Sequence, residues 1–137
     1  MKKKTIHLGV LSGVFSSMCC LLYSSFYHCH FADLSVDFSS VASPGGIIIA
    51  CVVAGLCTSL AYSLATKYWG APGEKAFHLV SVVFSILTVA AVFAATLPAT
   101  MPHPELFPGL TAPMHLLPIL SWFMLKPFFV TTQKEAL

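Results

Sequence analysis

Residues 46–97 read GIIIACVVAGLCTSLAYSLATKYWGAPGEKAFHLVSVVFSILTVAAVFAATL, two long apolar runs on either side of a short polar break. A helix needs about 20 mostly apolar residues to cross a bilayer, and each run has that length. The break contains Gly70-Ala71-Pro72-Gly73, a combination that interrupts helices. The pattern therefore predicts two membrane-spanning helices, over 46–68 and 77–97, joined by a tight turn.

Two further apolar stretches flank this pair, over about 6–27 and about 111–130. Hydrophobic residues make up 57% of the 137 residues and charged residues only 9%, whereas a soluble domain is about 25% charged. This composition excludes most soluble enzymes, nucleic-acid binders and disordered tails. We therefore expect an all-α membrane protein: a single transmembrane domain over 1–137, an up-down bundle of four helices in contact with the lipid bilayer and not with nucleic acid.

The N-terminal stretch also fits a secretory signal peptide, because three lysines precede an apolar run. However, no small-x-small cleavage site followed by a polar segment comes after it. We therefore expect this stretch to remain in the protein as the first span.

The lysines predict the orientation of the spans. All seven lie before the first span, between the second and third, or near and after the end of the fourth, whereas the other connections carry Asp33, Asp37 and Glu105. Because positive residues concentrate on the cytoplasmic side, this pattern predicts a multi-pass protein of the inner membrane with both termini in the cytoplasm. Aromatic residues would mark the interfaces: Tyr23, Tyr27 and Phe31 the outer one, Tyr68, Trp69 and Trp122 the inner one.

Local signals suggest where the helices begin. Ser43-Pro44 precedes the second span, and proline is favoured at the start of a helix. Thr111 is expected to cap the fourth helix, with Pro113 in its first turn. We expect Lys126, near the end of that helix, to extend its charged group to the interface.

Small residues follow one face of each of the first three expected helices. Gly9 and Gly13 form a GxxxG pair whose face continues through Ser16 and Cys20. The second helix carries Cys51, Ala54, Gly55, Thr58 and Ser59, and the third carries Ser81, Ser85 and Thr88. Close packing of small residues holds helices together in lipid. These faces predict packing within the bundle, or association with a second copy or a larger membrane complex.

Side chains that can bind metals gather near the expected outer face. They are His28, Cys29, His30, Asp33, His103, Glu105 and His115, with Met101 and Met114 nearby. His, Cys and Met together suit copper, and His with carboxylates suits zinc. His28 or His30 could also pair with His115 to ligate haem b. The alternative is that these residues lie among lipid headgroups and that no cofactor is bound.

Four of the five cysteines fall inside the expected spans, where a free cysteine usually acts as a small apolar filler. The adjacent pair Cys19-Cys20 resembles small bacterial mercury transporters, in which paired cysteines in the first helix pass a soft metal along. Leu21-Leu22-Tyr23 follows the pair here, in place of the glycine and proline context of those transporters.

The order of spans resembles small uncharacterised bacterial four-helix membrane proteins that are classed as a domain of unknown function. The resemblance rests on Lys2-Lys3-Lys4, the glycines of the first helix and Met114-His115 in the last. It covers most of the chain and implies a fold without an activity.

The sequence carries no Ser-His-Asp, HExxH or phosphate-binding glycine motif in a suitable context. We therefore expect a non-enzymatic homo-oligomer or accessory subunit of a larger membrane complex. The alternatives are binding or transfer of copper, zinc or haem by the outer histidines, and transport of a small solute. Transport would need a water-filled cleft at mid-depth, which the apolar spans do not suggest.

Overall fold

The structure is a computed structural model that describes residues 3–34, 37–97 and 101–129. Helix α1 spans Lys3–His30, α2 spans Pro44–Ala94 and α3 spans Phe107–Phe129. Two short 3-10 helices, η1 (Ala32–Leu34) and η2 (Pro104–Leu106), lie in the connections. All three α-helices are long and apolar enough to cross a membrane.

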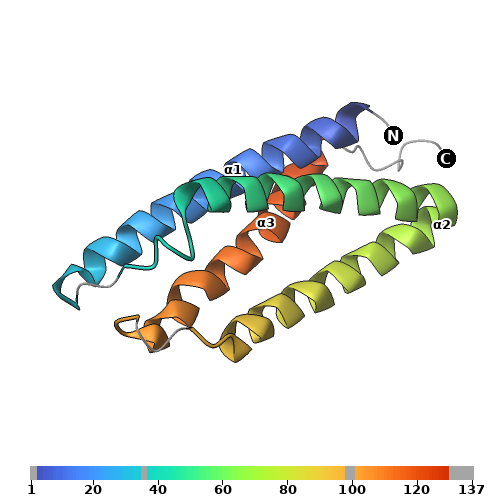
Figure 1. The fold of residues 1–137 in the computed structure, drawn as a ribbon. Coiled ribbons are helices and arrows are strands. Elements are labelled where there is room, and N and C mark those ends of the chain that lie inside the picture. The colour runs from blue at the N-terminus through green and yellow to red at the C-terminus, as the bar shows by residue number, and fades with distance from the viewer. Residues whose placement is uncertain (1–2, 35–36, 98–100, 130–137) are drawn as a thin grey trace.

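Helix α2 turns back on itself at Gly70, so the described residues form three α-helices where four are expected. Figure 1 shows its two arms, one green and one yellow-green, meeting at a sharp turn. Gly70 has non-helical angles at this turn, φ 58° and ψ −134°, which glycine adopts more readily than other residues. Helical residues adjoin Gly70 on both sides, which is why the two expected helices form one element. We call 44–69 the first arm and 71–94 the return arm.

The two ends of the bundle differ in charge. Figure 1 shows that α1 begins, α2 turns and α3 ends at the same end of the molecule. Of the lysines whose side chains the structure describes, Lys4 lies at the start of α1, Lys67 and Lys75 flank the turn of α2, and Lys126 lies in the last turn of α3. These four lysines therefore share one end of the bundle, and the connections on either side of α2 lie at the other.

The predicted start of α2 is confirmed, whereas the predicted start of α3 is wrong. The side chain of Ser43 accepts a hydrogen bond from the Gly46 N–H at 3.2 Å. Thr111 does not cap α3 but lies one turn inside it, where its hydroxyl donates to the Phe107 carbonyl. The helix begins earlier, with Pro108 in its first turn. N–H groups in the first turn have no acceptor within the helix, so a proline there removes no hydrogen bond.

Helix α1 crosses the first arm of α2 at three glycines. A Cβ atom placed on Gly55 would overlap the carbonyl oxygen of Gly9 and lie 2.9 Å from the Gly13 nitrogen. A Cβ atom on Gly13 would lie 2.7 Å from the Val52 Cα. The two backbones are therefore in direct contact, as small residues allow between membrane helices. The GxxxG face of α1 is thus occupied by α2 of the same chain.

Tyrosines of α1 bind carbonyl groups near the start of α3. Pro113 has no N–H to donate to the carbonyl of Gly109, four residues before it. The Tyr23 hydroxyl donates to this carbonyl at 2.8 Å, and the Tyr27 hydroxyl donates to Leu106 O at 2.7 Å. Because an unpaired carbonyl is costly in lipid, these two hydrogen bonds stabilise the contact between the helices.

Trp122 lies inside the bundle and not at the predicted inner interface. Its side chain is fully buried, whereas Trp69 is 68% exposed. The Trp122 indole N–H donates to the Ser59 hydroxyl at 2.9 Å, and its ring lies 5.1 Å from the rings of Tyr62 and Phe77. Tryptophan favours interfaces because its N–H needs a partner, and here Ser59 supplies that partner inside the protein.

Candidate functional site

A cavity of about 530 Å³ lies among the helices. Residues of α1, both arms of α2 and α3 contribute to its wall, which is mainly apolar. Its polar and sulfur-containing members include Cys20, Ser43, Cys51, Thr58, Ser81, Ser85, Thr88, Thr111, Met114 and His115. No Asp, Glu or Lys is among the described residues that line it. The cavity therefore suits a neutral, largely apolar molecule.

Most of the hydroxyl groups in the cavity wall already donate their protons to the backbone. Thr58 donates to Ala54 O at 2.7 Å, and Ser85 donates to Ser81 O at 2.9 Å. Thr88 and Thr111 make the same kind of bond within their own helices. Their remaining lone pairs can only accept hydrogen bonds. The polar part of the wall is therefore richer in acceptors than in donors.

His115 adds a further acceptor to this wall. Its Nδ1 lies 2.9 Å from the carbonyl oxygen of Thr111. Because a carbonyl only accepts, Nδ1 must carry the proton in this bond, which leaves Nε2 of the neutral ring with a lone pair. A ligand that carries an O–H group can donate to such a nitrogen.

Two cysteines of the cavity wall belong to a chain of hydrogen bonds between α1, α2 and α3. The Ser16 hydroxyl donates to Cys51 Sγ at 3.6 Å, and the Cys51 thiol donates to Cys20 Sγ at 3.7 Å. The Cys20 thiol in turn approaches the Met114 carbonyl at 3.9 Å. Pro118 has no N–H for this carbonyl, so the thiol takes the place of the missing helical donor. The cysteines therefore do more here than fill space.

The structure places the four predicted packing residues in two different settings. Gly9 and Gly13 lie at the crossing of α1 with the first arm. Ser81 and Ser85, on the return arm, line the cavity instead of a close helix contact. The small-residue face of the return arm thus borders open space, and this space is the cavity.

The seven residues of the predicted metal site do not come together. Among the described residues, no group of three or more His, Cys, Asp or Glu side chains is placed to hold a metal ion. His103 and Glu105 form an exposed pair at 3.1 Å on η2, whereas His115 lines the cavity. Asp33 is exposed on η1, and Cys29 is exposed on α1. These residues were grouped by their expected position near the outer face, but their side chains do not converge on one site.

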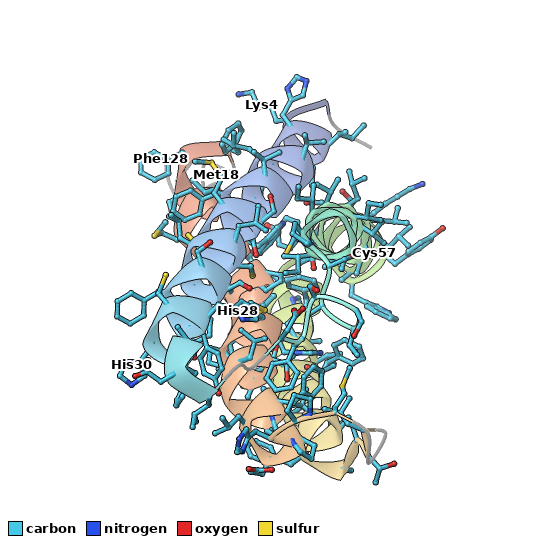
Figure 2. The ribbon with its side chains drawn as sticks, turned by 60° about the vertical axis from the view of Figure 1, so that its left-hand side comes forward. Lys4, Met18, His28, His30, Cys57 and Phe128 are labelled. Atoms are coloured by element: carbon cyan, nitrogen blue, oxygen red, sulfur yellow. The ribbon has the colours of Figure 1, made fainter. Side chains whose placement is uncertain are left out.

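The histidines proposed for haem also lie apart. Figure 2 shows His30 projecting outward from α1, while His28 is directed toward the protein. His28 lines a second, smaller cavity of about 280 Å³ together with Asp37, and His115 lines the larger one. In this second cavity, hydrogen bonds from Ser39 lower the pKa of the Asp37 carboxyl, and the charge of His28 adds to the effect. The structure thus does not place His28 and His115 across one pocket.

A polar cluster at the turn of α2 was not predicted. Lys126 donates to a carboxylate oxygen of Glu74, and its Nζ lies 3.0 Å from His78 Nε2. The Lys126 side chain is only 12% exposed, and its Nζ lies 4.9 Å from the centre of the Tyr62 ring. Lys126 therefore joins the end of α3 to the turn of α2.

Signals for these missed contacts are present in the sequence. Cys20 and Cys51 each lie on the small-residue face of their helix, and two faces that pack together bring such residues close. Glu74 and His78 are one helical turn apart at the same end of the bundle as Lys126. Both clusters can be found by asking two questions of each residue: on which face of its helix it lies, and at which end of the bundle.

The described residues define an all-helical protein whose three α-helices are long and apolar enough to cross a membrane and border a partly open cavity. No protein-family model, curated protein or solved structure matches the chain.

Proposed function

We propose that this chain is a small integral membrane protein that binds a neutral, largely apolar ligand from the bilayer in the cavity between its helices. The observation that supports the proposal is the cavity itself, since α1, both arms of α2 and α3 border it. Ligand sites in helical bundles lie between helices and combine apolar walls with a few polar groups. The proposed role of the cavity is to bind this ligand.

The proposed topology has four membrane passes, with both termini on the cytoplasmic side of the inner membrane. A straight helix of the 51 residues of α2 would extend about 77 Å, more than twice the hydrocarbon thickness of about 30 Å. The turn at Gly70 divides it into two arms of suitable length. The four described lysines share one end of the bundle, as the positive-inside rule expects of a cytoplasmic end.

The hydrogen-bonding character of the wall narrows the class of ligand. Thr58, Thr111 and His115 offer acceptors, because their protons are already donated to carbonyl groups. A ligand with an O–H group satisfies these acceptors, whereas an otherwise identical ether does not. We therefore propose an apolar alcohol, phenol or hydroquinone as the class of ligand.

This proposal predicts that 4-nonylphenol binds in the cavity and raises the unfolding temperature of the protein in detergent. Its methyl ether, which lacks the O–H donor, is expected to bind about two- to tenfold more weakly, since one hydrogen bond contributes about 0.5–1.5 kcal/mol. Native mass spectrometry checks for one bound molecule per chain, and thermal unfolding gives the relative affinity.

Two phenylalanine substitutions provide a matched control on the first arm. Ala54→Phe places a ring in the cavity and should abolish the stabilisation by 4-nonylphenol, because Ala54 lines the wall. Ala61→Phe, at an exposed position on the same arm, should leave it unchanged. Equal binding of phenol and ether to both variants and to the wild type would contradict the proposal.

A second candidate function is self-association through the return arm. Six of its large apolar side chains are 61% to 68% exposed: Leu79, Val80, Phe84, Ile86, Leu87 and Phe93. In a bilayer such a surface contacts either lipid or another helix, and we propose a second copy of this chain as its partner.

Cysteine cross-linking in liposomes tests this second candidate. In a background with Cys29→Ser and Cys57→Ser, the substitution Leu87→Cys should give cross-linked dimers on mild oxidation. Met18→Cys, on the outer face of α1 (Figure 2), is the control and should give few. Equal cross-linking at both positions, or none at either, would exclude the return arm as the interface.

A further inference from the structure

Cys20 of α1 and Cys51 of α2 face each other in the wall of the cavity. Their sulfur atoms are 3.7 Å apart, compared with about 2.05 Å in a disulfide, so closure requires a movement of less than about 2 Å. Both side chains are buried, whereas Cys29 and Cys57 are exposed. Figure 2 shows Cys57 on the side of α2 that faces away from α1. The pair is therefore set apart from the other thiols by its position.

The apolar surroundings of this pair favour a reaction in which both the reduced and the oxidised form of the pair are uncharged. A dithiol and a disulfide are both neutral, so burial in an apolar region penalises neither. Two thiolates around a monovalent soft metal ion would carry a net negative charge. No lysine is among the described residues of the cavity wall to balance that charge. The pair is therefore better suited to exchanging electrons than to holding a metal.

The cavity offers room for an oxidant, and the bilayer limits the class to which that oxidant belongs. A molecule that reaches the pair through lipid must itself be apolar, and it must accept two electrons to yield one disulfide. A lipid-soluble quinone has both properties. Its reduced form carries two O–H donors, which match the acceptors of Thr111 and His115 better than the carbonyl groups of the quinone do. Tighter binding of the reduced form favours the transfer of electrons to the quinone.

We propose that Cys20 and Cys51 are a redox-active dithiol that reduces a lipid-soluble quinone in the cavity and closes to a disulfide between α1 and α2. In this step two S–H bonds break and one S–S bond forms. Two electrons and two protons pass to the quinone, and its two carbonyl oxygens become hydroxyl groups. Closure also removes the Cys20 thiol proton from the Met114 carbonyl. This inference rests on the proposed function, because the quinone occupies the same cavity.

The test uses the full chain in detergent with Cys19→Ser, Cys29→Ser and Cys57→Ser, so that only the proposed pair remains. Decylubiquinone is the probe, because its fully substituted ring has no open position to which a thiol can add. We expect one quinone molecule to be reduced per chain, and the change in quinone absorbance measures this reduction. Both maleimide-reactive thiols should disappear, and the intact mass should fall by that of two hydrogen atoms.

A matched control keeps the number of thiols and separates them. A chain that retains Cys20 and Cys57, with Cys51→Ser, should reduce no quinone and keep both thiols. Disulfide mapping of the wild-type chain after the same treatment should identify a Cys20–Cys51 link, which provides the test without any substitution.

Three results would overturn the proposal. In the first, decylubiquinone displaces 4-nonylphenol but leaves both thiols reduced. In the second, the mapped disulfide joins other cysteines. In the third, the purified protein carries copper or zinc on the pair, and the two thiols are not oxidised. In each of these results, binding of 4-nonylphenol still supports the proposed function. Failure of 4-nonylphenol itself to bind refutes that function separately.

Discussion

Gly55→Ala is expected to lower the stability of the protein in detergent by about 1–3 kcal/mol or more, the usual cost of inserting atoms into a closely packed interior. The new Cβ would overlap Gly9 O and lie 2.9 Å from the Gly13 nitrogen. Both are backbone atoms, so α1 must move away from α2 to make room. This movement would also disturb Cys51 and Ser59, which lie one turn on either side of Gly55. The thermal unfolding temperature of the purified variant measures the effect.

Gly45→Ala is the matched control for this prediction. A Cβ atom on Gly45 would meet nothing within 4 Å, although the residue lies in the first turn of the same helix. Alanine favours a helix over glycine by about 1 kcal/mol, so this variant should be as stable as the wild type or slightly more stable. If both variants unfold at the wild-type temperature, the close crossing of α1 and α2 is wrong.

Trp122→Ala is expected to have the second large effect, a loss of about 3–5 kcal/mol, as for large buried aromatic side chains in general. Trp122 is fully buried and packs against Tyr62 and Phe77. Its removal leaves a void between both arms of α2 and α3 and also removes the donor to Ser59 Oγ. Chemical or thermal unfolding in detergent, followed by circular dichroism, measures the loss.

Trp69→Ala provides the comparison, because Trp69 is 68% exposed and should change the stability little. The two single-tryptophan variants also separate the fluorescence signals. Emission from Trp122, in the Trp69→Ala variant, should resist quenching by acrylamide and by brominated lipid alike. Strong quenching by either agent would show that Trp122 is not enclosed as described.

The helical character of the chain could be predicted because it follows from apolar length alone. The turn at 70–73 was also predictable, since glycine and proline interrupt helices. The number of helical elements was not predictable in the same way. It depends on the backbone angles of Gly70, which let helical residues resume directly after the turn.

The residues that line the cavity were harder to predict, and the reason is geometric. Hydropathy and lysine positions indicate the depth of a residue in the membrane, but they do not give its direction around the helix axis. His28, His30 and His115 were grouped by depth, and the helices direct them to different places. Cys20 and Cys51 meet because the faces of their helices match, which depends on how α1 and α2 cross.

Trp122 and Thr111 show the same limit for single residues. A tryptophan near the end of a span is expected at the interface, but Ser59 of another helix provides a buried partner for its N–H. A threonine before a proline is expected to cap a helix, but Pro108 allows the helix to begin a turn earlier. Both outcomes depend on neighbours that local patterns do not contain.

The prolines of α3 have a consequence for the order in which the protein assembles. Their missing N–H groups leave the carbonyls of Gly109 and Met114 to side chains of α1, namely Tyr23 and Cys20. Helix α3, alone in lipid, would expose both carbonyls without donors. In the proposed membrane topology, α1 is synthesised before α3, so its donors would already be in the bilayer when α3 arrives. Helix α1 would then satisfy the two carbonyls of α3 as α3 inserts.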